Sequence, residues 1–155
     1  MSDAIEIRKG SPQHTVFMRG DTLLDAVIRQ IAQWLPILEL AVAKQHGVAA
    51  GPVYARLHSR EGKIVDMEVG LPVQTLLTAT GQVSVGELPG GDLAVLTHEG
   101  AYAGIPALRR TLIDWVRENG RSAAGSPWLS FVIHRKGESD VSKWRTELIL
   151  PLEPE

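Results

Sequence analysis

A single carboxylate stands inside an apolar segment near the end of the chain. The segment runs Trp144-Arg-Thr-Glu-Leu-Ile-Leu-Pro-Leu152 and has the composition of a buried strand. Moving Glu147 out of water is costly unless a cation or a set of donors meets it. We therefore predict that Glu147 is unpaired in the free protein and either binds a ligand or takes part in catalysis. The alternative is a glutamate paired with Arg145 on the same strand face; a carboxylate paired with a guanidinium, or open to solvent, would contradict the prediction.

The segment around Glu147 has a counterpart earlier in the chain. Met67-Glu-Val-Gly-Leu-Pro-Val73 matches Thr146-Glu-Leu-Ile-Leu-Pro-Leu152, so that Glu68 recurs 79 residues later as Glu147. Further matches are Pro72 with Pro151, Gly20 with Gly100 and Pro52 with Pro127. The chain is therefore expected to contain two repeats, at about 13–73 and 91–152, and Glu68 becomes a second candidate for ligand contact.

Two apolar patterns have the periodicity of helices. In the first, apolar residues between 24 and 41 recur every three or four positions and form one stripe. Thr22 and Asp25 have the spacing of a capping box at its start, and Pro36 should kink or split the helix. The second helix begins near Pro106, since proline suits an early helical position.

The segments between these helices have the patterns of strands. Besides the segment around Glu147 they are 15–18, 53–58, 64–71, 83–88, 92–98 and 128–134. Each repeat then contains a strand, a helix and a hairpin. We predict an α+β fold in which two pseudo-symmetric βαββ units form an antiparallel curved sheet with both helices on one face, within a single domain spanning 1–155.

Composition excludes several classes of function. A chain of 155 residues with 44% hydrophobic content can bury a core, and a net charge of -2 without a basic run argues against a nucleic-acid partner. The absence of cysteine removes thiolate chemistry, and the five histidines lack metal-ligand spacing. No phosphate-binding glycine loop appears, and no run approaches the about 18 apolar residues of a membrane span. We expect a cytoplasmic protein without cofactor, metal or membrane partner.

Five short motifs follow one another in a fixed order. They are Asp66-Met-Glu-Val-Gly-Leu-Pro-Val73, Leu88-Pro-Gly-Gly91, His98-Glu-Gly-Ala-Tyr102, Pro127-Trp128 and Trp144-Arg-Thr-Glu147. Together they resemble the GyrI-like small-molecule-binding domain, also called the bacterial transcription activator effector-binding domain, over roughly 15–152. Members often follow a helix-turn-helix segment in multidrug-responsive regulators and also occur alone. We expect the stand-alone form here.

The resemblance implies a pocket in which aromatic rings surround Glu147 and receive lipophilic, often cationic compounds. Each ring would add about 0.5 to 2 kcal/mol of cation–π attraction. The ligand-binding residues predicted in this way are Glu147, Tyr102, Phe131, Trp144, Tyr54, Glu68 and Trp128. Trp128 and Phe131 alternate to opposite strand faces, and Phe131 is expected to be the one that faces the pocket. The chain departs from the family in having Leu129, Phe131 and His134-Arg135 where acidic and tyrosine side chains are common.

Two other functions remain open. Some stand-alone members of the family are described as hydrolases of electrophilic small molecules, which would make Glu147 a general base or nucleophile and Tyr102 a proton donor. Gyrase-inhibitor members instead suggest a protein partner such as a topoisomerase. Turnover would distinguish the first function from binding, and an exposed apolar patch without an enclosed pocket would favour the second.

Overall fold

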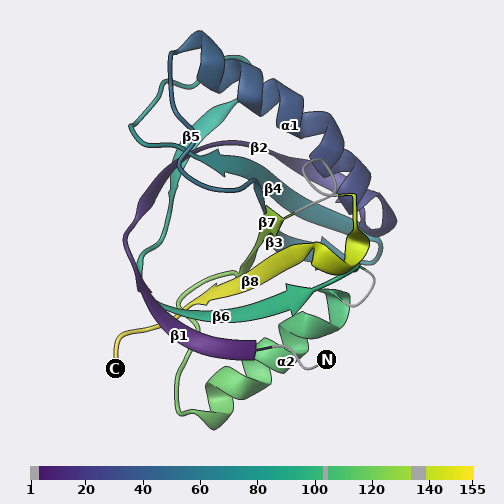
Figure 1. Cartoon of the computed structure of the whole chain (residues 1–155), viewed down its shortest axis with the longest axis vertical. Coiled ribbons are helices and arrows are strands. Elements are labelled where there is room, and N and C mark those ends of the chain that lie inside the picture. The colour runs from purple at the N-terminus through teal and green to yellow at the C-terminus, as the bar shows by residue number, and fades with distance from the viewer. Residues whose placement is uncertain (1–3, 103–104, 134–138) are drawn as a thin grey trace. The chain divides into compact units, whose positions relative to one another are not determined.

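The computed structural model describes residues 4–102, 105–133 and 139–155 (Figure 1). The chain divides into two compact units, one formed by Met1–Ser11 with Gly90–Glu155 and the other by Pro12–Pro89. In the described residues, each unit has one α-helix and four strands that form an antiparallel sheet. The predicted α+β class and the two βαββ units are confirmed.

The unit Pro12–Pro89 is built around the hairpin that carries Glu68. Its strands are β2 (Gln13–Leu23), β3 (Tyr54–Glu61), β4 (Ile64–Pro72) and β5 (Ser84–Leu88), in the spatial order β3-β4-β2-β5. Alternate residues of β4 point to opposite faces. Val65, Met67 and Val69 are fully buried on the face that α1 (Val27–Lys44) covers through contacts with β2 and β4. Glu68 therefore lies on the other face.

The start of α1 differs from the prediction. Thr22 belongs to β2, a short 3-10 helix, η1 (Leu24–Ala26), precedes α1, and neither helix start has a side-chain cap. The capping-box prediction is wrong because the strand continues further than its apolar pattern indicated. Pro36 lies inside an unbroken helix, so the helix is not split. Burial of Leu35 and Leu38 on either side of Pro36 stabilises the helix against the loss of one hydrogen bond.

One helical segment is long and apolar enough to cross a membrane. By length and composition alone, Leu24–Lys44 meets that criterion, although the apolar run lengths did not suggest a span. A core helix of a soluble protein and a signal sequence near the N-terminus both meet the same criterion. In this unit the helix buries five residues and contacts β2 and β4, and these residues are Ile31, Leu35, Leu38, Ala41 and Val42.

The unit containing Gly90–Glu155 repeats this arrangement around Glu147. Its strands are β1 (Ala4–Gly10), β6 (Gly91–Glu99), β7 (Trp128–Ile133) and β8 (Arg145–Pro151), in the order β1-β6-β8-β7, with α2 (Ile105–Glu118) and the short 3-10 helix η3 (Val141–Lys143). The helix packs on β6 and β8. The buried cluster between them is Ala94, Leu96, Leu108, Leu112, Val116, Leu148, Leu150 and Leu152. The strand predicted over 128–134 is described to Ile133; His134 and Arg135 lie outside the described residues.

The two units share backbone hydrogen bonds at equivalent positions. The Ala50 amide donates to the Pro72 carbonyl at 2.8 Å, and the Ala124 amide donates to the Pro151 carbonyl at 2.8 Å. The strand register changes one of the predicted matches between the repeats. Gly20 pairs with Met67 on β4, and the residue equivalent to Met67 on β8, Thr146, pairs with His98. The counterpart of Gly20 is thus His98, two residues before Gly100.

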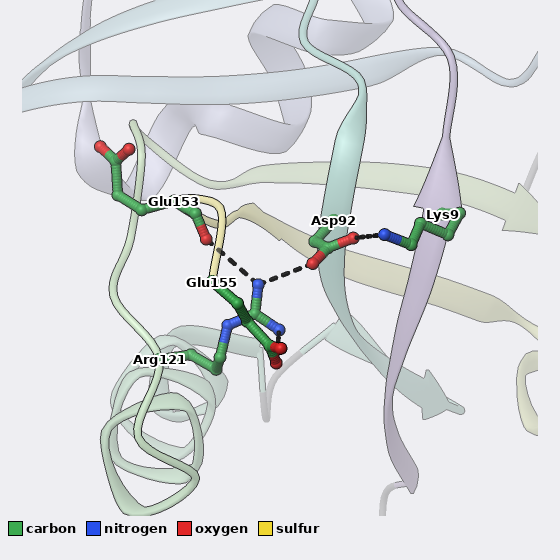
Figure 2. A network of polar contacts seen from close by, with 5 residues as sticks. All are labelled: Lys9, Asp92, Arg121, Glu153 and Glu155. Atoms are coloured by element: carbon green, nitrogen blue, oxygen red, sulfur yellow. Dashed lines mark hydrogen bonds and ion pairs between the residues drawn. The ribbon is translucent and has the colours of Figure 1, made fainter.

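A polar network holds β1 and the C-terminal segment to β6 (Figure 2). The Asp92 carboxylate lies 2.6 Å from the Lys9 ammonium and 2.7 Å from an Arg121 guanidinium nitrogen. Arg121 also donates to the Glu153 carbonyl at 3.1 Å and pairs with Glu155 at 3.3 Å. Hydrogen bonds from Lys9 and Arg121 lower the pKa of Asp92 below its ordinary value. The network secures β1, the strand whose side chains reach Glu147.

Candidate functional site

Glu147 lies on the sheet face that α2 does not cover. It sits on β8 directly between Thr97 on β6 and Ser130 on β7. Its neighbour Leu148 belongs to the core under α2, and successive side chains of a strand point to opposite faces. The side chain of Glu147 is 10% exposed, so the predicted burial of this carboxylate is observed.

Apolar side chains border Glu147 along the same face. Ile149 follows it by two residues on β8 and lies opposite Val95 on β6 and Trp128 on β7. Val95 and Trp128 are buried. These apolar side chains on one side of Glu147 exclude water there and so strengthen its interaction with a cation that reaches it.

The carboxylate of Glu147 is paired with guanidinium groups, so the prediction of an acid that stays unpaired until a ligand arrives is contradicted. Arg8 Nη1 donates to Glu147 Oε2 at 2.9 Å, and Arg145 Nη2 lies 3.7 Å from the same oxygen. The Nε of Arg8 donates to Glu6 Oε1 at 2.5 Å. The hydrogen bonds to Glu6 and then to Glu147 raise the pKa of Arg8 above its ordinary value. Within the described part of the chain, Oε1 of Glu147 makes no hydrogen bond.

Three of the predicted aromatic residues form a cluster in the same unit. The Tyr102 ring meets Phe131 edge-on with centroids 5.7 Å apart and stacks on Trp144 at 4.9 Å. Phe131 lies opposite Thr146. The side chain of Thr146 points to the sheet face that α2 covers. Phe131 therefore lies on the strand face opposite to that of Glu147; that it lines a ligand pocket stays a prediction. Trp128 has the parity of Glu147.

The predicted residues Tyr54 and Glu68 come together in the other unit. The Tyr54 hydroxyl donates a hydrogen bond to Glu68 Oε2, and His58 Nε2 lies 2.8 Å from Glu68 Oε1. Burial, and next the charge of Glu68, raise the pKa of Tyr54 far above its ordinary value. The Tyr54 ring occupies the space where a side chain at Gly70 would begin, since a Cβ there would lie 2.5 Å from it. This site thus holds a buried acid with a phenol and an imidazole.

Sequence reasoning missed Arg8 and His58. Arg8 lies in Ala4-Ile-Glu-Ile-Arg-Lys-Gly10, where Ile5 and Ile7 alternate with charged residues. That alternation is the pattern of a half-buried strand and would have indicated β1. His58 lies in a bulge of β3, where the register shifts between Leu57 and Ser59. No pattern in the sequence marks such a shift.

Comparison with solved structures shows the same fold in proteins of low sequence identity. The EcmrR C-terminal domain superposes with a TM-score of 0.87 at 19% identity, with 100% of each chain covered. EcmrR in a complex with DNA superposes with a TM-score of 0.86 at 18% identity; 99% of this chain is covered, and it spans 58% of that chain. SAV2435 bound to tetraphenylphosphonium superposes with a TM-score of 0.61 at 12% identity, covering 99% of this chain and 94% of that one.

Sequence comparisons place the chain in a family. No curated protein sequence matches it. Residues 8–153, however, match the family described as the GyrI-like small molecule binding domain. This match covers nearly the whole chain, including both buried glutamates and Arg8. The chain therefore belongs to the GyrI-like small-molecule-binding domain family.

Proposed function

We propose that the chain binds hydrophobic organic cations and that Glu147 is their counter-ion. The observation that carries this proposal is the nearly buried carboxylate of Glu147 on the sheet face that α2 leaves uncovered, beside apolar side chains. Its pairing with the Arg8 guanidinium at 2.9 Å contradicts the prediction of an unpaired acid, so the proposal requires a ligand that replaces this guanidinium. A guanidinium is itself a planar, delocalised organic cation and is weakly hydrated. The position next to Glu147 therefore already suits a cation of this kind.

The surroundings of Glu147 favour a ligand that is apolar as well as charged. Val95, Ile149 and Trp128 share its sheet face, and an indole ring attracts cations through its π face. The tetraphenylphosphonium bound to SAV2435 combines one delocalised positive charge with four phenyl rings. That protein has the same fold, and its sequence is 12% identical to this one. We therefore use its ligand as a probe to test the proposal.

Calorimetric titration with two ions of the same shape and opposite charge tests the proposal. Tetraphenylphosphonium should bind, and tetraphenylborate should bind at least roughly tenfold more weakly, a difference of about 1.4 kcal/mol. Glu147→Gln keeps the size of the side chain and removes its charge, so the preference for the cation should disappear. Equal binding of both ions, or stronger binding of the borate to Arg8 and Arg145, would contradict the proposal.

A further inference from the structure

Arg8 shares its guanidinium between two acids of different exposure. Nε binds Glu6, whose side chain is 57% exposed, and Nη1 binds Glu147, whose side chain is 10% exposed. Arg8 is 41% exposed, so solvent reaches both Arg8 and Glu6, whereas Glu147 is nearly buried. A guanidinium that leaves Glu147 still has Glu6 and water as partners. Glu147 would keep only Arg145, at 3.7 Å and without a hydrogen bond, so losing Arg8 without a replacement costs desolvation energy.

We propose that Arg8 is a tethered competitor for the cation position at Glu147, and that an organic cation binds by displacing Arg8 onto Glu6. This inference rests on the proposed function, since it names what a ligand must replace. One positive charge takes the place of another at Glu147, so the buried carboxylate remains compensated throughout.

This exchange would make Arg8 a determinant of specificity. A neutral compound of the same shape cannot replace the charge that Arg8 supplies, so it leaves the ion pair in place. A cation competes with a group attached to the same sheet, whose effective concentration is high. Only a cation that also gains contact with the apolar face is then expected to displace Arg8.

Arg145 offers a matched control for general electrostatic effects. It carries the same charge, its side chain is 43% exposed, and it lies 3.7 Å from the oxygen that Arg8 binds. It differs in that no hydrogen bond joins it to Glu147, and its buried Nε has no hydrogen-bond partner in the part of the chain described. Replacing either arginine with a neutral residue changes the net charge by the same amount. Only the replacement of Arg8 removes the hydrogen bond to Glu147.

Tetraphenylphosphonium affinity of four proteins tests the exchange. Arg8→Gln should bind roughly threefold to tenfold more tightly than wild type, and Arg145→Gln should gain less. Glu6→Gln should bind more weakly, because Arg8 loses the acceptor that receives it. Circular dichroism and thermal unfolding establish that each variant is folded. Should Arg8→Gln fail to fold, Arg8→Lys takes its place: it keeps the charge, lacks the planar fork that reaches both acids, and should still bind more tightly than wild type.

The outcomes separate this inference from the proposed function. An unchanged or weakened affinity in Arg8→Gln, or an equal gain in Arg145→Gln, overturns the exchange while loss of binding in Glu147→Gln still supports the counter-ion. Absence of binding in both wild type and Arg8→Gln overturns both proposals. As an independent readout, the NMR signal of the Arg8 Nε–H group, assigned by its loss in Arg8→Gln, should shift on saturation with tetraphenylphosphonium; an unmoved signal at saturation overturns the exchange.

Discussion

Glu68 and Glu147 occupy the same position in two duplicated sheets but have different partners. Glu68 lies on the central strand β4 and accepts hydrogen bonds from Tyr54 and His58. Glu147 lies on the equivalent strand β8 and is paired with Arg8. Both acids are nearly buried, so each unit needed its own means of compensating the carboxylate. A phenol and an imidazole hydrogen-bond the acid in one unit, and a permanent cation pairs with it in the other.

Tyr54→Phe should destabilise the protein and change its response to alkaline pH. At neutral pH the loss is expected to be about 1 to 3 kcal/mol, because Glu68 loses a buried donor. The folded state raises the pKa of Tyr54 above the ordinary 10.0, so its contribution is present below that pH and is lost as the pH rises beyond it, where the unfolded chain ionises. Urea unfolding at about pH 8 and about pH 11 checks this. Parallel losses of stability in wild type and variant would contradict it.

Gly70→Ala should destabilise the unit that contains Glu68. The added methyl group would meet the Tyr54 ring at 2.5 Å, which forces the ring off Glu68 or the strands apart, at a cost of about 1 to 3 kcal/mol. Gly20→Ala is the control, since its methyl group would contact Trp34 at an ordinary 3.5 Å. Thermal unfolding of both variants provides the comparison, and a Gly70→Ala protein as stable as Gly20→Ala would refute the expected clash.

The fold was predictable from sequence where periodicity and repetition agreed. The hairpin around Glu61-Gly62 and the match of Glu68 with Glu147 depend on residues within one repeat or on its duplication, and both are visible along the chain. The N-terminal strand was missed because its alternation is short and because charged side chains occupy the face that carries Glu147. Its partner β6 lies more than 80 residues away, and no local pattern predicts such a pairing.

The candidate site was predictable only in part for the same reason. Burial of Glu147 follows from its apolar neighbours in sequence, whereas its partner Arg8 comes from a distant edge strand. The sequence showed that Trp128 and Phe131 point to opposite faces of their strand. Which of these faces carries Glu147 depends on the register of β7 against β8. That register pairs Ser130 with Glu147 and so directs Trp128 to that face.

Asp92→Asn should lower the melting temperature at neutral pH and have little effect in acid. Lys9 and Arg121 lower the pKa of Asp92 below the ordinary 3.8, so the stabilising contribution is present above that pH and is lost as the pH falls through the folded-state pKa. The difference in melting temperature between wild type and variant should therefore shrink on acidification. Differential scanning calorimetry across this range measures it, and a difference that stays constant would show that the Figure 2 network acts through packing and not through charge.

Trp128 and Phe131 should differ in their effect on ligand affinity because β7 directs them to opposite faces. Trp128 has the parity of Glu147, and Phe131 packs against Tyr102 on the side of the α2 core. Trp128→Phe should weaken tetraphenylphosphonium binding roughly threefold or more, since phenyl attracts cations less strongly than indole. Phe131→Leu should keep the affinity and lower the stability. Calorimetric titration and thermal unfolding of both variants separate these effects. The opposite ranking of affinities would restore Phe131 as the aromatic wall and would move the binding site toward the Tyr102 cluster.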